Sequence, residues 1–242
     1  MQQRIVVASG KGGVGKSTIS ACLAQEMASK GHKVLLIDCD IGLRSLDLIL
    51  GVDEHVLFTW ADVALGRCTL SQAIMLFDGI HLLCAPLQSE QALRDDMLRQ
   101  LMLSCNDYDV VIIDSPAGIG FGFRAAVQAA NKCLIVTTAD PICVRSVAAA
   151  AARARRYGLK DVRLVINRFC RKQALDGKLM MIDEVIDQTE VQLIGVIPQQ
   201  SELFCQTANG APLRAGLVQN AIAQIAARLE GSNVPLTISS SK

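Results

Sequence analysis

Eight consecutive residues near the start of the chain have the types and spacing of a phosphate-binding loop. Gly10–Ser17 read Gly-Lys-Gly-Gly-Val-Gly-Lys-Ser, which fits the pattern G-x-x-x-x-G-K-[ST]. Glycines let backbone N–H groups point inward at phosphate oxygens, and a following helix adds partial positive charge at its first turn. Lys16 would reach the β- and γ-phosphates, and the Ser17 hydroxyl would bind Mg²⁺. The pattern therefore predicts a site for ATP and magnesium.

The whole loop and the first helical turn are expected to contact the phosphates. The predicted contacts are Gly10, Lys11, Gly12, Gly13, Val14, Gly15, Lys16, Ser17 and Thr18.

The same glycines also fit a second pattern, G-x-G-x-x-G, which binds dinucleotides. It uses Gly10, Gly12 and Gly15, and Asp38 lies at about the spacing of an acid that binds ribose. Two features favour a triphosphate instead. A Lys-Ser pair directly after the last glycine suits a phosphate chain with a metal. A second acid, Asp114, ends another apolar run, where phosphate-loop enzymes keep a metal-shell aspartate.

Apolar runs predict the elements that position these side chains. Val34–Ile37 and Val110–Ile113 are apolar at every position, which indicates strands buried on both faces, as in a parallel sheet covered by helices. We therefore expect an α/β fold with a doubly wound, mostly parallel sheet and helices on both faces, the P-loop NTPase fold. Strands are predicted at Arg4–Ser9, Lys33–Asp38, Ile80–Cys84, Asp109–Asp114, Lys132–Thr137, Val162–Asn167 and Leu193–Pro198. Helices are predicted at Lys16–Lys30, Leu93–Ser104, Gly122–Ala130, Pro141–Tyr157, Leu179–Gln188 and Leu217–Leu229.

The bulk composition limits the classes of protein that remain. The 242 residues, 51% of them apolar, suit one domain over residues 1–230, and residues 231–242 are expected to be a disordered tail. A net charge of +1 gives no general attraction to nucleic acid, so DNA binding is not expected. No apolar run approaches the roughly 18 residues of a membrane span, and no signal peptide is evident. We therefore expect a cytoplasmic protein.

Nine cysteines raise the question of a metal centre or of disulfides. No two of them form a C-x-x-C pair, and they are spread through predicted strands and helices. This distribution is typical of reduced thiols that act as small apolar side chains. A cluster that bridges two subunits would need few cysteines from each chain, and it stays open as an alternative.

Lys11 adds a second lysine to the loop, so that residues 9–18 read Ser-Gly-Lys-Gly-Gly-Val-Gly-Lys-Ser-Thr. This stretch resembles the deviant Walker A motif of the MinD/ParA/Mrp class of ATPases. The resemblance implies that Lys11 reaches across a dimer interface to the partner's nucleotide. A second cation at the γ-phosphate would neutralise charge that one subunit leaves exposed. ATP would then hold two subunits together, and hydrolysis would release them.

Within this class the chain is most similar to the MinD family, over roughly residues 3–236. Residues 38–51, Asp-Cys-Asp-Ile-Gly-Leu-Arg-Ser-Leu-Asp-Leu-Ile-Leu-Gly, resemble the family's first switch. The resemblance implies that Asp40 orients the attacking water and that Asp38 lies near the Mg²⁺ shell. Residues 114–118, Asp-Ser-Pro-Ala-Gly, resemble the second switch. Asp114 would hold a metal-bound water, and Gly118 would lie near the γ-phosphate.

The base site is implied by matches later in the chain. Asn167 and Arg168 stand where the class places its adenine-reading asparagine, and an amide can both donate to and accept from the adenine edge. Residues 195–198, which end in Pro198, and residues 209–212, Asn-Gly-Ala-Pro, also match.

Two features depart from the family pattern. Residues 140–146, Asp-Pro-Ile-Cys-Val-Arg-Ser, differ at several positions from the family's N-P-x-x-S-x-R-D stretch. The sequence also lacks the short basic amphipathic helix that MinD proteins insert into the membrane. The helix predicted at Leu217–Leu229 has Arg228 as its single cation, whereas membrane-surface helices usually carry several. We expect this helix to pack on the sheet, with no autonomous membrane binding, so that any peripheral membrane association would come through a partner.

The resemblance implies a slow ATPase that acts as a dimerising spatial switch in division-site placement, controlled by a division inhibitor or topological factor. Flagellar-positioning and chromosome-partitioning ATPases stay open as alternatives. An iron–sulfur ATPase, either a reductase or a metallocentre-maturation factor, is the alternative of another class, although residues 115–123 contain no cysteine. A basic run on and just after the predicted helix at Pro141–Tyr157 is expected to be a solvated face, with a regulator-docking or weak DNA-binding surface as the alternatives. It consists of Arg153, Arg155, Arg156 and Lys160.

Overall fold

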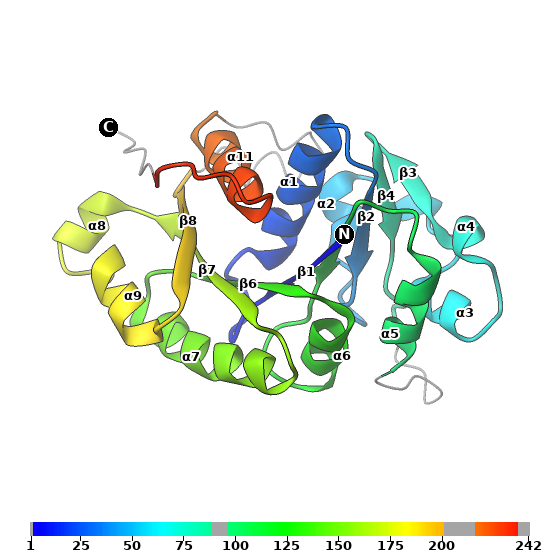
Figure 1. The fold of residues 1–242 in the computed structure, drawn as a ribbon, viewed down its shortest axis with the longest axis horizontal. Helices are drawn as coiled ribbons and strands as arrows, with labels where there is room; N and C mark the ends of the chain where they lie inside the picture. Colours follow the sequence, from blue (N-terminus) through cyan, green and yellow to red (C-terminus); the bar gives the residue numbers. More distant parts are fainter. Residues whose placement is uncertain (1, 89–95, 201–215, 237–242) are drawn as a thin grey trace.

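A single twisted sheet lies at the centre of the computed structural model, which describes residues 2–88, 96–200 and 216–236. Its strand order is β3-β4-β2-β5-β1-β6-β7-β8 (Figure 1). All neighbouring strands are parallel except β3, which pairs antiparallel with β4. The strands are β1 Gln3–Ala8, β2 Val34–Asp38, β3 Met75–Phe77, β4 Ile80–Leu83, β5 Val110–Asp114, β6 Lys132–Thr137, β7 Asp161–Phe169 and β8 Gln192–Pro198. The expected α/β fold with a mostly parallel sheet is confirmed.

Helices cover both faces of the sheet and create two cores. One core includes side chains of α1, α2 and α11, and the other includes side chains of α3, α5, α6, α7 and α9. Successive strand residues point to opposite faces, so Ile5 and Val7 enter the first core while Val6 and Ala8 enter the second. This double burial explains why the strands read as unbroken apolar runs. The helices are α1 Lys16–Ser29, α2 Leu46–Leu50, α3 Trp60–Ala64, α4 Leu70–Ala73, α5 Met97–Leu101, α6 Phe121–Ala129, α7 Pro141–Arg156, α8 Arg171–Leu175, α9 Ile182–Thr189 and α11 Gly216–Leu229, with 3-10 turns η1 Asp53–His55 and η2 Met102–Ser104.

Several short elements were not predicted from the sequence. The edge strand β3 has only three residues, all partly or fully exposed, and the helices α2, α3, α4 and α8 have four or five residues each. Such lengths are too short for a helical or strand periodicity to develop. The first residues of the helix predicted at Leu93–Ser104 and the match at residues 209–212 lie outside the described residues.

Asp140 is the N-cap of α7 and shows what one departure from the family pattern does. Its carboxylate accepts hydrogen bonds from the backbone N–H groups of Ile142 at 3.0 Å and Cys143 at 3.1 Å. Pro141 occupies the first helical position, where its missing N–H is no loss. Aspartate is among the preferred N-cap residues, so Asp140 stabilises the start of α7 although the family pattern has asparagine at this position.

The last helix, α11, packs on the sheet as the sequence predicts. Val218, Ile222, Ile225 and Leu229 are each at most 4% exposed. The strand beneath makes room with Gly195, because a Cβ atom there would lie 2.3 Å from Cγ1 of Ile225. The apolar face of α11 is therefore part of the core.

Arg228 holds the segment that follows α11 through hydrogen bonds to the backbone. Its guanidinium donates to the carbonyls of Ile194 at 2.7 Å, Val234 at 3.0 Å and Pro235 at 2.7 Å. Residues up to Leu236 are described, and the rest of the expected tail lies outside the described residues. The single cation of α11 thus binds backbone carbonyls of the protein itself.

Two general expectations can be compared with the structure. The cysteines of the described residues are all free thiols and most are buried, while Cys205 lies outside those residues. Within the same ranges, no helix combines the length and apolar character needed to cross a bilayer.

We expect Gly195→Ala to lower the free energy of unfolding by about 1–3 kcal/mol, because the added methyl group would overpack the contact with Ile225. The midpoint of urea unfolding measures this change. Gly120→Ala is the matched control, since its new Cβ would have no neighbour within 4 Å. That control should change stability by less than about 0.5 kcal/mol. Equal stability of the two variants would mean that α11 does not pack on β8 as described.

Candidate functional site

The glycine-rich loop connects β1 to α1, and its glycines are needed for its shape. Gly13 and Gly15 have φ angles of 79° and 95°, in the left-handed region that favours glycine. A Cβ at Gly10 would lie 2.5 Å from Cβ of Ser146 on α7, so that no side chain fits between loop and helix. Gly12 is exposed, and a Cβ there would meet only Ala117 at 3.7 Å. At its glycine positions the loop therefore presents backbone rather than side chains to its surroundings.

The side chains of the loop differ in exposure according to their expected roles. Lys16 starts α1 and is only 7% exposed, beside the N–H groups of the first helical turn. The side chain of Val14 is buried in the core, so this residue can offer only its backbone to a ligand. Ser17 and Thr18 are partly exposed, and the Ser17 hydroxyl lies 3.5 Å from that of Ser45. Lys11 is exposed at the surface.

Two buried carboxylates lie side by side next to this loop. Asp38 ends β2, Asp114 ends β5, and the two residues are paired in register, each with 0% exposure. Burial and the charge of Asp38 together raise the pKa of Asp114 to about 7, against the opposing effects of Ser17, Lys16 and Ser20. Burial also raises the pKa of Asp38 to about 6, although its carboxylate accepts two backbone hydrogen bonds.

The oxygen atoms at this point fit a magnesium ion. Oδ1 of Asp114 accepts a hydrogen bond from the Ser20 hydroxyl at 2.9 Å, whereas its Oδ2 is buried without a partner among the described residues. A buried carboxylate oxygen without a partner is costly unless a ligand or water supplies one. Hydroxyl and carboxylate oxygens are the ligands that Mg²⁺ prefers. Within the described ranges no three His, Cys, Asp or Glu side chains are arranged to hold a metal, so a cation here would need phosphate oxygens as well.

The two switch-like segments are tied to these carboxylates and to the loop. Asp38 accepts hydrogen bonds from the N–H groups of Asp40 at 2.8 Å and Leu46 at 3.1 Å, which closes the first segment around it. Burial raises the pKa of the Asp40 carboxyl, and the nearby charge of Lys16 acts in the opposite direction. In the second segment, the N–H of Gly118 donates to the carbonyl of Ser9 at 3.1 Å. Gly118 has a φ of 85°, which again favours glycine.

The residues predicted to read adenine lie at the end of β7. This strand continues to Phe169, two residues beyond its predicted end at Asn167. Asn167 donates to the carbonyl of Val14 at 2.8 Å, and Arg168 donates to that of Gly13 at 3.1 Å. Pro198 ends β8 and pairs with Phe169. The structure thus brings Asn167 and Arg168 to the loop, with Pro198 on the neighbouring strand.

Sequence reasoning missed two hydroxyl groups at this site. Ser20 donates to Asp114, and it lies three residues after Ser17, on the same face of α1, which was a usable signal. Ser45 comes near Ser17 only through the fold of the first switch-like segment, so the sequence alone carried no signal for it.

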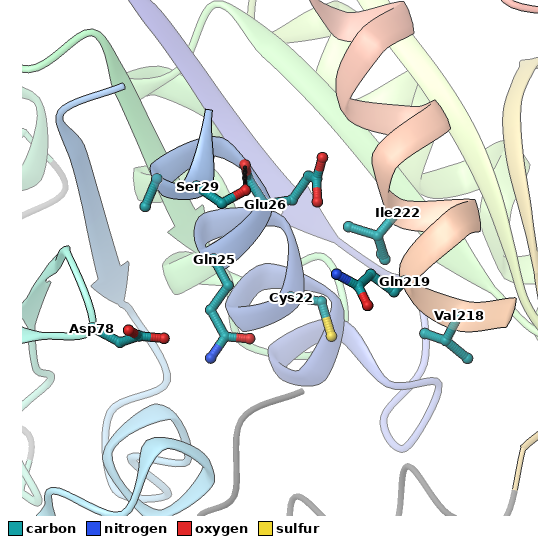
Figure 2. A pocket seen from close by; sticks show the side chains of 9 residues that line it. Cys22, Gln25, Glu26, Ser29, Asp78, Val218, Gln219 and Ile222 are labelled. Carbon is teal, nitrogen blue, oxygen red and sulfur yellow. Dashed lines mark hydrogen bonds between the residues drawn. The ribbon is translucent and has the colours of Figure 1, made fainter. Parts of the chain in front are cut away.

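A separate cavity of about 400 Å³ lies between α1 and α11 (Figure 2). The side chains of Glu26 and Asp78 border it and would repel phosphate. Cys22 also lines it, and burial raises the pKa of this thiol to about 12, so it is not a reactive thiolate. Residues 10–17 are not among the described residues that line this cavity, which makes it a poor candidate for a nucleotide site.

Known proteins are similar to this chain, in sequence and in fold, over nearly its whole length. The ParA family model, described as NUBPL iron-transfer P-loop NTPase, matches residues 1–231. The septum site-determining protein MinD of Synechocystis sp. is 35% identical over 97% of this chain and 92% of its own length. The MinC:MinD cell division protein complex of Aquifex aeolicus matches with a TM-score of 0.90 and 30% identity, covering 99% of this chain and 100% of that chain. MinD of Pyrococcus horikoshii complexed with Mg-ADP matches with a TM-score of 0.85 and 27% identity, covering 95% and 96%.

We expect Asp114→Asn to stabilise the nucleotide-free protein by about 2 kcal/mol at pH 8, and by much less at pH 5. The pKa of Asp114 is raised to about 7 in the folded state from an ordinary 3.8. Its contribution to stability is therefore complete below pH 4 and is lost as the pH rises through 7. Urea midpoints in EDTA at the two pH values measure the difference. Asp53→Asn, at an exposed carboxylate of η1, is the control. If Asp114→Asn raises the free energy of unfolding no more at pH 8 than at pH 5, the expectation is wrong.

Proposed function

This chain belongs to the ParA/MinD family of P-loop ATPases, and from that premise we propose that it binds ATP with Mg²⁺ and dimerises while ATP is bound. We further propose that it acts as a spatial switch in division-site placement. One observation carries the proposal. Lys16 and Ser17, at the first turn of α1, meet Asp38 and Asp114 at the ends of neighbouring strands.

The phosphates would be held by the backbone N–H groups of the loop and by the ammonium of Lys16. A bound Mg²⁺ would neutralise charge on the β- and γ-phosphates, and Ser17, Asp38 and Asp114 are the residues that would hold it. The Mg-ADP in the Pyrococcus horikoshii relative supports this ligand pair. The adenine would lie near Asn167, Arg168 and Pro198, because an amide can still accept from the base while it donates to the loop.

Asp40 is the proposed residue that orients the attacking water. It is partly buried two residues after Asp38, and its carboxylate can accept a hydrogen bond from water, with the nearby charge of Lys16 favouring the ionised form against the effect of burial. The loop itself contains no arginine, so transition-state charge falls on Lys11 and Lys16. This arrangement supports slow hydrolysis in the absence of a regulatory partner.

The dimer face is proposed to lie at the rim of the same site. Leu43, Phe121 and Ile142 are 66%, 51% and 66% exposed. They follow the carboxyl ends of β2, β5 and β6, so they lie at the same end of the sheet as exposed Lys11. Exposed apolar side chains gathered in this way indicate a protein contact. The MinC bound in the Aquifex aeolicus complex supports a regulatory partner of the division-inhibitor type.

Experiments can distinguish division-site placement from the alternative functions. Flagellar-positioning and chromosome-partitioning ATPases would differ in their partners. An iron–sulfur role is suggested by the iron-transfer description of the matching family model. In the described part of the chain, no group of three or more His, Cys, Asp or Glu side chains could hold a metal ion, so a cluster would have to bridge two subunits or use other residues. Absorption near 400 nm in anaerobically purified protein would favour the iron–sulfur alternative.

We expect a non-hydrolysable ATP analogue with Mg²⁺ to convert the protein from monomer to dimer in light scattering. Lys11→Ala should stay monomeric, because the cross-subunit cation is gone, while Lys172→Ala on exposed α8 is the matched control. Asp40→Ala should still bind ATP and dimerise, with hydrolysis reduced about 100-fold or more. Lys16→Ala should lose nucleotide binding. A dimer that forms equally well without nucleotide, or in Lys11→Ala, would refute the switch.

We expect the purified protein not to sediment with anionic liposomes in the presence of either ATP or ADP. The apolar face of α11 is buried, and releasing it would expose four side chains at about 1.5–3 kcal/mol each. Its only cation, Arg228, already binds backbone carbonyls. ATP-dependent pelleting that is lost on deletion of residues 231–242 would overturn this expectation.

A further inference from the structure

The end of β7 departs from a regular strand where it meets the phosphate loop. Its pairing with β8 is irregular between Ile166 and Phe169, and Arg168 has a left-handed backbone with a φ of 54°. Arginine rarely adopts this conformation, since its Cβ crowds the following carbonyl. In a regular strand, consecutive side chains point to opposite faces, whereas Asn167 and Arg168 both reach the same loop.

The two side chains donate to consecutive carbonyls of the loop. The Asn167 amide is 2.8 Å from the carbonyl of Val14, and the Arg168 guanidinium is 3.1 Å from that of Gly13. Asn167 is 6% exposed, so its bond is shielded from water, while the bond from Arg168 lies at the surface. A Cβ at Gly15 would lie only 2.4 Å from the Asn167 amide nitrogen, so the asparagine packs directly against the loop.

These bonds suit what a phosphate loop requires. Its N–H groups must face the ligand, so its carbonyls must face away, and carbonyls turned away need partners of their own. Asn167 and Arg168 supply those partners for two residues in succession. We propose, building on the proposed nucleotide site, that both are positioning residues, which hold the loop in its phosphate-binding conformation in addition to any contact with the base.

The strain at Arg168 gives this proposal a distinctive signature. Glycine would adopt the same φ without strain but would remove the donor. Arg168→Gly should therefore raise the urea midpoint of unfolding while it weakens binding of Mg-ADP a few-fold. Arg171→Ala, which removes a nearby exposed arginine on α8, should leave binding unchanged. If Arg168→Gly changes stability and affinity in the same direction, Arg168 has only a structural role.

Asn167→Asp provides the main test, because aspartate keeps the shape of asparagine but cannot donate to the carbonyl of Val14. Calorimetry would give dissociation constants for Mg-ADP, Mg-GDP and magnesium pyrophosphate. A positioning role weakens all three by a similar factor of about tenfold or more. If the variant loses affinity for Mg-ADP alone, Asn167 reads the base only and the proposal is overturned.

A matched control lies at the opposite end of the sheet. Asn131 donates to the carbonyl of Gln2 at 3.0 Å and accepts from the N–H of Arg4 at 2.9 Å. Asn131→Asp should leave all three dissociation constants unchanged, and a loss equal to that of Asn167→Asp would overturn the proposal.

Hydrogen exchange of residues 12–16 in the nucleotide-free protein separates this proposal from the proposed function. Faster exchange in Asn167→Asp supports the positioning role, and unchanged exchange refutes it. Failure of the wild-type protein to bind Mg-ADP would refute the proposed function instead, and the exchange measurement would still decide the positioning role.

Discussion

Two carboxylates buried side by side, Asp38 and Asp114, set the electrostatics on which the rest of the site depends. They lie in register on neighbouring strands, and the charge of Asp38 raises the pKa of Asp114 in addition to the effect of burial. Lys16 is the cation that acts on Asp114, and it is itself buried. The sheet order produces this meeting, because β5 lies between β2 and β1, and the loop with Lys16 follows β1. A bound cation would relieve the remaining repulsion between the two carboxylates, which suits the Mg²⁺ of the proposed function.

Hydrogen bonds extend from these carboxylates to the rim of the site. Asp38 binds the backbone on both sides of the first switch-like segment, and this segment carries the exposed Leu43. The second segment begins at Asp114 and is bonded to the loop through Gly118, shortly before the exposed Phe121. A change of charge between the aspartates can therefore shift the backbone that presents the rim. In the proposed function, this connection would be the physical route from nucleotide state to surface shape.

The sequence predicted most of the sheet because burial on both faces leaves an unmistakable apolar run. It predicted the loop, Asp38 and Asp114 because strand ends of a parallel sheet meet at one edge. It could not predict β3, whose three residues gain their pairing only from the neighbouring β4. It also could not predict the extension of β7, since the irregular pairing at Arg168 depends on the loop that Arg168 contacts. Arg228 is a similar case, because its carbonyl partners come from β8 and from the segment after α11.

Apolar side chains differ in burial between the helix α11 and the rim of the candidate site. The apolar face of α11 is already covered, whereas Leu43, Phe121 and Ile142 are left exposed at the rim. Covering these three side chains on each of two subunits would contribute about 6–12 kcal/mol, at roughly 1–2 kcal/mol for each half-exposed side chain. Association costs about 4–15 kcal/mol in lost freedom, so this contact alone leaves a dimer marginal. An added attraction of a few kcal/mol, such as the proposed one between Lys11 and the partner's phosphates, would then decide whether two copies stay together. For the proposed dimer, this balance would make association depend on nucleotide, as a reversible switch requires.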